Sequence, residues 1–248
     1  SLSTGFRAPS LAQVYYNLRF TNFSSGGATE VILSSNDSPV TQAFGINKLN
    51  EEKAVNGSLG VTASFGAFTA TVDGYFINVK DRIVLTGYFD ASALNLGVSA
   101  AQFFTNGVDT KTAGVDVVLA WKKKFGENSL SATLVGNINH MTIGDVKNGT
   151  LDKETFFGER EKAFLLASAP ANKFGLNLNY DRKWFNAGVA FTRFSKVELL
   201  DYQMYEDVAD YGSFANQIKA ATDTYNAKIV TDLTLGFKLN KASKLSIG

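Results

Sequence analysis

Apolar and polar residues alternate along seven segments of this chain, and this period-two pattern is the feature that most limits its fold. Successive side chains of a strand point to opposite sides, so the pattern predicts seven half-apolar β-strands. Most segments approach the roughly 9–11 residues that a tilted membrane strand needs, whereas strands of soluble sandwiches are usually nearer five or six residues. The segments are 55–65, 68–76, 113–121, 130–138, 174–180, 185–191 and 229–237.

The connections between these segments alternate between short and long. The long, polar ones fall at about 86–110, 145–172 and 196–226. The tight ones are Phe65–Phe68, Lys122–Asn128, Tyr180–Trp184 and Lys238–Lys244. This alternation is typical of an outer-membrane barrel, which has short periplasmic turns and long external loops. Aromatic residues flank the short turns, as expected for rings at a membrane–water interface.

The period-two pattern also assigns a side of the sheet to each residue. We expect the apolar side to face lipid and to include Leu59, Val61, Val117, Leu119, Trp121 and Leu235. We expect the polar side to face the lumen and to include Asp73, Asp116, Asn177, Asn179 and Asp232, together with Tyr75, Asn137 and Asn139. A soluble β-sandwich is the alternative, and it would bury Val61, Leu119 and Leu235 against one another.

Composition excludes several classes of function. Lys plus Arg (24) nearly balance Asp plus Glu (23), so we expect no nucleic-acid partner. Cysteine is absent, which excludes disulfide frameworks and thiolate chemistry, and we expect neither a cofactor nor a metal site. The single histidine, His140 near Asp145, invites an acid–base interpretation, but the chain has no G-x-S-x-G motif and we expect no enzyme activity.

The strand count predicts an incomplete ring. Seven strands and a truncated eighth at 245–248 leave two unpaired edges, and an unpaired edge cannot face hydrocarbon. We therefore expect this chain to be an arc of a larger barrel, or to be completed by other chains.

Six motifs in order along nearly the whole chain resemble those of TonB-dependent outer-membrane receptors. The first is Thr4–Leu11, "TGFRAPSL", followed by Tyr15 and Tyr16. The others are Leu49–Asn56, Tyr75–Ile83, Asn106-Gly107 with Thr112–Asp116, Ala169–Lys173 and Tyr225–Asp232. The chain departs from the family pattern at Glu51, where proline is usual, and at Asp116, where glutamate is usual.

The resemblance implies a place for the chain in a plugged barrel of about 22 strands. Residues 1–248 would form part of the barrel domain, with a corner and loop at 1–48 and strands and loops at 49–248. They would run from about the thirteenth strand into about the twenty-first. The plug and the final strands would lie outside this chain.

The resemblance also implies an active-transport receptor of the outer membrane. Such a receptor binds a scarce, large solute. A siderophore or other metal chelate is the first candidate for this solute, and haem, cobalamin and glycans are the alternatives. The receptor imports the solute with energy that the TonB complex transmits through the plug. A barrel enzyme of the outer membrane and a passive porin are the alternatives.

Candidate ligand-binding residues fall at the corner and in the last long connection. They are Arg7, Tyr202, Met204, Tyr205, Tyr211 and Phe214. Arg7 could instead bond local carbonyls at a corner where Pro9 ends sheet pairing. The aromatic residues could instead pack within their loop, where 212–222 could form a short helix. The nearby carboxylates Asp201, Glu206, Asp207 and Asp210 could bind Ca²⁺ or be solvated, and their spacing is not that of an EF-hand.

Overall fold

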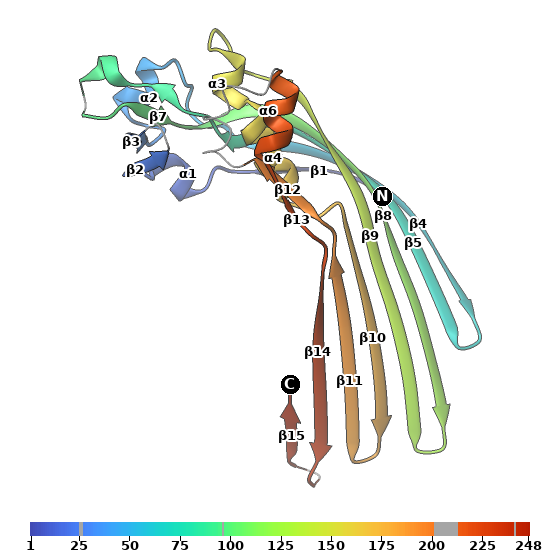
Figure 1. Ribbon diagram of the computed structural model, residues 1–248. Helices are drawn as coiled ribbons and strands as arrows, with labels where there is room; N and C mark the ends of the chain where they lie inside the picture. Colours follow the sequence, from blue (N-terminus) through green and yellow to red (C-terminus); the bar gives the residue numbers. More distant parts are fainter. Residues whose placement is uncertain (25–26, 96, 201–212, 241) are drawn as a thin grey trace.

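The computed structural model is dominated by one long, curved antiparallel sheet whose long connections gather at one end (Figure 1). It describes residues 1–24, 27–95, 97–200, 213–240 and 242–248. The sheet has nine strands in the order β1-β4-β5-β8-β9-β10-β11-β14-β15. These are β1 Leu2–Arg7, β4 Glu52–Phe65, β5 Phe68–Leu85, β8 Phe104–Phe125, β9 Asn128–Val146, β10 Asn172–Arg182, β11 Phe185–Phe194, β14 Lys228–Lys238 and β15 Lys244–Ile247.

All seven predicted strands are present, and the sheet is not half of a sandwich. Val61 keeps 71% of its surface exposed, and Leu119 is also exposed. Neither belongs to the cluster of buried apolar residues described below. The predicted all-β, antiparallel fold is therefore confirmed, and within the described ranges β1 and β15 each have a partner on one side only.

Several strands extend beyond the segments that alternate. β5 continues to Leu85 and β8 begins at Phe104, so the connection expected at 86–110 is shorter than predicted. The ladder between β5 and β8 shifts register between Val79 and Ile83, where Asp81 has a positive φ of 58°. Such a bulge breaks the two-residue period while pairing continues. The pattern therefore marks only the regular part of each strand.

The turn expected at Lys122–Asn128 is also shorter than predicted. β8 runs to Phe125 and β9 starts at Asn128, which leaves a two-residue connection. Gly126 has φ 61°, and Gly66 in the equivalent turn between β4 and β5 has φ 59°. Two-residue hairpins need positive φ, which glycine adopts without steric cost.

The register places the two predicted sets of residues on opposite faces of the sheet. Residues directly opposite each other in a ladder point to the same side. Val61, Val72 and Val117 pair across three strands and define the apolar face. Asp73, Asp116 and Asn137 pair across three strands and define the polar face. By the same ladders Leu59, Leu119, Trp121 and Leu235 lie on the apolar face, and Asn177, Asn179 and Asp232 lie on the polar face.

A side-chain network on the polar face explains why Gly114 lacks a side chain. The ring of Tyr75 covers Gly114, and a Cβ there would lie 2.4 Å from the ring. Tyr75 can then place its hydroxyl 3.0 Å from Asn137 Nδ2, which donates to it. The Asn137 amide also donates to Asp116 Oδ1 at 2.7 Å. The glycine thus allows an aromatic ring to lie flat across the neighbouring strand.

Replacing Gly114 with Ala is expected to destabilise the folded barrel by about 1–3 kcal/mol, because the new methyl group must displace Tyr75. The measurement is urea unfolding of the full-length receptor in detergent. Gly57→Ala is the control, since a Cβ at Gly57 meets nothing within 4 Å. Equal losses for the two variants would contradict the role given to Tyr75.

The short and long connections lie at opposite ends of the sheet (Figure 1). The turn end comprises the connections 66–67, 126–127, 183–184 and 239–243. The loop end comprises 8–51, 86–103, 147–171 and 195–227. No helix within the described ranges is both long enough and apolar enough to span a membrane.

The loop end contains its own secondary structure. β2, β3, β7 and β6 form a small sheet in the order β2-β3-β7-β6, and β12 pairs with β13. The strands are β2 Leu18–Ser24, β3 Gly27–Leu33, β6 Phe89–Asp90, β7 Ala100–Gln102, β12 Val197–Leu200 and β13 Thr222–Tyr225. The helices are α1 Leu11–Tyr15, α2 Pro39–Ala43, η1 Ser92–Leu94, α3 Lys153–Phe157, α4 Glu159–Ala167 and α6 Phe214–Ala221.

The opening motif forms the corner between the sheet and the loop end. β1 ends at Arg7, two residues before Pro9. Ser10 then caps α1, because its hydroxyl accepts from Gln13 N and its own N–H donates to Gln13 Oε1. This reciprocal pair is a capping box, which starts a helix directly after the proline.

Candidate ligand-binding surface at the loop end

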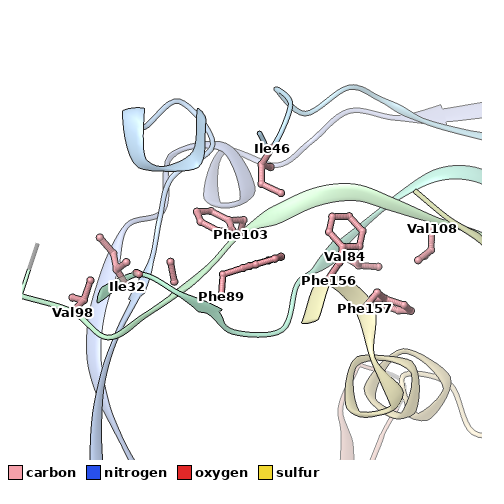
Figure 2. Close-up of a cluster of buried hydrophobic side chains, with 11 residues drawn as sticks. Ile32, Ile46, Val84, Phe89, Val98, Phe103, Val108, Phe156 and Phe157 are labelled. Carbon is pink, nitrogen blue, oxygen red and sulfur yellow. The ribbon is translucent and has the colours of Figure 1, made fainter. Parts of the chain in front are cut away.

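Three of the connections at the loop end share one hydrophobic core (Figure 2). Phe103 and Phe89 come from the connection between β5 and β8, and Phe156 and Phe157 come from α3. Phe103, Phe156 and Phe157 are each at most 2% exposed. The remaining members are Ile32, Ile46, Val84, Ala91, Val98, Ala101 and Val108. The connections 8–51, 86–103 and 147–171 therefore pack as one body, called the loop body below.

Close approaches hold the loop body against the sheet. A Cβ at Gly107 would lie 2.8 Å from Val84 Cγ2 and 3.1 Å from the Phe156 ring. Thr86, which is fully buried, accepts from Gln102 Nε2 through its carbonyl oxygen, and its hydroxyl oxygen accepts from Phe103 N. These bonds satisfy polar groups that would otherwise be costly to bury.

Asn106 joins three strands where they enter the loop end. Its Nδ2 donates to Asn50 O at 3.0 Å and to Asp81 O at 2.7 Å, while its Oδ1 accepts from Asn50 N at 2.8 Å. Asn106 thus holds the start of β4 and the bulge of β5 beside β8. This gives a physical reason for an asparagine in the Asn106-Gly107 motif.

Arg7 makes a two-point salt bridge with Glu52. Its Nε donates to Oε2 at 2.8 Å, and its Nη2 donates to Oε1 at 2.6 Å. Oε1 also accepts from Ile83 N at 2.8 Å. The Arg7 side chain is 54% exposed and the Glu52 side chain 10%. The sequence had offered a ligand or local carbonyls as partners of Arg7, and both interpretations missed a carboxylate 45 residues away.

The salt bridge shifts the pKa of both partners, which lie beyond the apolar part of the sheet. Burial alone would raise the pKa of Glu52, but the hydrogen bonds from Arg7 and from Ile83 N–H outweigh it and lower that pKa. The hydrogen bond to Glu52 raises the pKa of Arg7. Glu52 therefore stabilises the fold as a carboxylate, and this contribution is lost as the pH falls below its usual pKa of 4.5.

Replacing Arg7 with Gln is expected to cost about 1–3 kcal/mol at pH 7, because the mostly buried Glu52 loses its charged donor. The loss should shrink as the pH falls from 7 towards 3, since Glu52 becomes neutral and no longer needs a cation. Unfolding midpoints of the full-length receptor across this range measure it. Lys48→Gln is the control, because Lys48 pairs with Asp37 at 3.6 Å in an exposed position. A loss that is constant with pH would contradict the proposed role of Glu52.

A second ionic contact fixes the bulge of β5. Lys147 Nζ lies 2.7 Å from Asp109 Oδ1 and also contacts the Asp81 carboxylate. Asp109 Oδ1 accepts from Asp81 N at 2.9 Å as well. Burial opposes the charge of Asp109, but the hydrogen bonds from Lys147 and from Asp81 N–H, together with the charges of Lys147 and Lys80, outweigh it and lower the pKa of Asp109. These bonds stabilise the positive φ of Asp81.

Two hollows open at the loop end. The first, of about 360 Å³, is lined by the end of β5 and by α4, including Leu85, Phe157 and Phe164. The second, of about 580 Å³, lies among β9, α4, β12 and α6 and is lined by Met141, Leu199, Ile218 and others. Both volumes fall within the range of about 300–1,000 Å³ that is typical of small-molecule sites.

The lining of the second hollow combines apolar and charged residues. Lys162 Nζ bonds Glu159 Oε1 at 2.6 Å, and Lys196 Nζ bonds Glu198 Oε1 at 2.6 Å. All four of these residues line the hollow. The combination suits a solute with an apolar surface and several polar groups.

The structure places one aromatic candidate of the last connection near the second hollow. Phe214 begins α6 and is 52% exposed, and Ile218 on the same helix lines the hollow. α6 lies within the range 212–222 where a short helix was expected. Tyr202, Met204, Tyr205 and Tyr211 lie outside the described residues, as do Asp201, Glu206, Asp207 and Asp210.

His140 is exposed on the apolar face, opposite Ala113, whereas Asn137 and Asn139 point to the other side. Within the described ranges, no three His, Cys, Asp or Glu side chains come together in a group that could hold a metal ion.

Comparisons with known proteins agree with this architecture. Residues 1–248 match the family model described as "TonB dependent receptor-like, beta-barrel". A comparison with curated protein sequences finds no match. Among solved structures, a mutant of the ferric enterobactin receptor PfeA from Pseudomonas aeruginosa is 15% identical with a TM-score of 0.57, and the match covers 97% of this chain and 30% of that one.

Two further solved structures have the same fold. The siderophore receptor PirA from Acinetobacter baumannii is 16% identical with a TM-score of 0.54, over 97% of this chain and 32% of that one. The copper transporter OprC is 18% identical with a TM-score of 0.53, over 99% of this chain and 29% of that one. The chain thus spans about a third of the length of these proteins or less. It belongs to the family of TonB-dependent receptors, in whose outer-membrane β-barrels the short connections are periplasmic and the long ones are external.

Proposed function

We propose that this chain is part of a receptor that binds a scarce, large solute on its external side and imports it with TonB-transmitted energy. The observation that carries the proposal is the loop body, which has its own aromatic core and lies at the loop end of a curved sheet (Figure 1). A rigid external body with open hollows suits capture of a solute, because little order has to form on binding.

A metal chelate, and first a siderophore, is the proposed solute. Two observations support this class. The solved proteins of the same fold are described as a siderophore receptor, a ferric enterobactin receptor and a copper transporter. The lining of the second hollow combines apolar side chains with paired charges. This combination suits a chelate that has an apolar backbone and polar groups. Haem, cobalamin and glycans are the competing solutes.

Each candidate residue has a proposed role. Phe214 and, beyond the described residues, Tyr202, Met204, Tyr205 and Tyr211 contact the solute through aromatic or thioether surfaces. Arg7 positions the corner through Glu52 and acts on the solute only indirectly. The polar face, with Asp73, Asp116, Asn177, Asn179 and Asp232, lines the lumen against a plug. The apolar face, with Leu59, Val61, Val117, Leu119, Trp121 and Leu235, contacts lipid.

The proposed chemistry is binding and release, without bond-making. Residues 1–248 are one part of the barrel domain, and the plug that contacts TonB is a separate segment of the receptor. Outer-membrane lipid, the TonB complex and the solute are the partners.

Growth of a strain that lacks this receptor, under limitation for iron, cobalamin or glycans in turn, tests the solute class. We expect loss of growth only when iron is supplied as a chelate, with rescue by the receptor gene. Rescue that is independent of TonB would contradict the transport mechanism. In liposomes, rapid swelling in small sugars would identify a passive porin instead.

Binding of the chelate to purified receptor variants tests the site. Phe214→Ala should weaken binding roughly three- to tenfold, as expected for the loss of one aromatic contact. Leu11→Ala is the control, because Leu11 is equally external but lies on α1. Equal affinities for the two variants would remove Phe214 from the site.

A further inference from the structure

The turn end of the sheet is strongly basic, although the whole chain is almost neutral. Eight of its 24 Lys and Arg residues fall in or beside the short turns, against two of its 23 Asp and Glu residues. The described cations are Lys122, Lys123, Lys124, Arg182, Lys183, Lys238 and Lys244, and the two acids are Glu127 and Asp181. The rest of the chain therefore carries net negative charge.

Two of these cations share the apolar face of the sheet. Lys123 lies opposite Leu130, and Arg182 lies opposite Asn128 and Phe185. Lys123 and Arg182 are separated laterally by β9 alone. Both are exposed, and both lie within the last three residues of their strands before the turns.

Aromatic rings lie directly beside these cations. Trp184 and Phe185 have ring centroids 5.8 Å apart, and Phe185 and Phe237 are 5.2 Å apart. Phe68 and Trp121 form a similar contact at 6.2 Å. Such rings sit at the depth of the lipid headgroups. The cations are therefore at headgroup depth, next to a surface that suits acyl chains.

The cations of the turn end lack the partners that those of the loop end have. Across the described parts of the chain, Lys122, Lys123, Lys124 and Arg182 make no side-chain hydrogen bond or ion pair. Lys183 has a single exposed contact with Glu127 at 3.5 Å. At the loop end, by contrast, Arg7 and Lys147 pair with carboxylates.

We propose that Lys123, Arg182 and the neighbouring turn cations bind the headgroups of anionic phospholipids in the periplasmic leaflet. A ligand there must carry negative charge beside the cations and acyl chains beside the apolar face, and an anionic phospholipid has both. Cations near an anionic membrane surface each add favourable electrostatic energy. The inference rests on the proposed assignment of the apolar face to lipid.

Native mass spectrometry of the full-length receptor in detergent, with phosphatidylglycerol or phosphatidylcholine added, tests this inference. The wild type should retain phosphatidylglycerol in preference to phosphatidylcholine. Lys123→Gln with Arg182→Gln should lower retention of phosphatidylglycerol about tenfold or more, and should leave phosphatidylcholine unchanged. The charge-preserving pair Lys123→Arg with Arg182→Lys should restore it.

Matched double variants separate the possible outcomes. Lys80→Gln with Lys111→Gln removes the same charge from the apolar side at the loop end, and it should leave phosphatidylglycerol retention unchanged. Lys122→Gln with Lys124→Gln removes charge from the polar face at the turn end and should have a smaller effect. A larger effect of this last pair would show that the faces are reversed and would overturn the inference.

Two other outcomes would also overturn it. Equal retention of the two lipids by the wild type would show that the cations do not select headgroups. Displacement of phosphatidylglycerol by millimolar inorganic phosphate would show an anion site without a lipid component. Solute binding by the Lys123/Arg182 variant should stay at the wild-type level, so a failure of the proposed receptor function would be recognised separately.

Discussion

Replacing Val117 with Arg is expected to destabilise the folded barrel by about 2–4 kcal/mol, the cost of a basic side chain near the bilayer midplane. Val117 pairs with Val72 on one side and with Gly136 on the other. Apolar residues continue on this face in both directions, at Val115 and at Leu119. The guanidinium would therefore lie far from either headgroup layer.

Val118→Arg is the matched control, because Val118 is the adjacent residue of the same type on the opposite face. It pairs with Thr71 and Val135 on the polar side of the sheet. Asn177→Arg tests the same face at another strand, and both controls should cost clearly less than Val117→Arg. Refolding titrations of the receptor into lipid bilayers measure all three. Equal damage from Val117→Arg and the two controls would mean that the faces are assigned wrongly.

Replacing Phe103 with Ala is expected to destabilise the loop body by about 3–5 kcal/mol, the usual cost of deleting a buried Phe ring. Phe103 is fully buried and contacts Phe44 and Phe89, with ring centroids 5.1 Å and 5.9 Å away. These three rings come from two different connections. Loss of the Phe103 ring should separate the two connections, while the ladders of the main sheet stay intact.

Hydrogen exchange of the full-length receptor distinguishes local opening from global unfolding. In the Phe103→Ala variant, amides of residues 28–46 should exchange faster, whereas those of 128–138 should keep their protection. Affinity for the solute should fall as the hollows lose their shape. Leu11→Ala, at an exposed position, should change neither property. Unchanged exchange at 28–46 would show that the connections do not depend on one core.

The loop body was only partly foreseeable from the sequence. Phe103, Phe156 and Phe157 stand in the predicted long connections, where no two-residue period assigns a side to their rings. The sequence does not say which segments share the core of the loop body, because its contacts join separate connections, as Phe44 does with Phe89 and Phe103. The salt bridge of Arg7 with Glu52 was missed for the same reason.

The sequence by itself determined the side of the sheet that each strand residue takes, the positions of the turns and the end of β1 before Pro9. These features depend on neighbours one or two residues away, so a local pattern is sufficient to predict them. Only the tertiary structure decided the bulge at Asp81, the extension of β5 and β8, the partner of Arg7 and the common core of the external connections. Each of these features depends on contacts between segments that are distant in the sequence. A local pattern of residues cannot predict the free energy of such contacts.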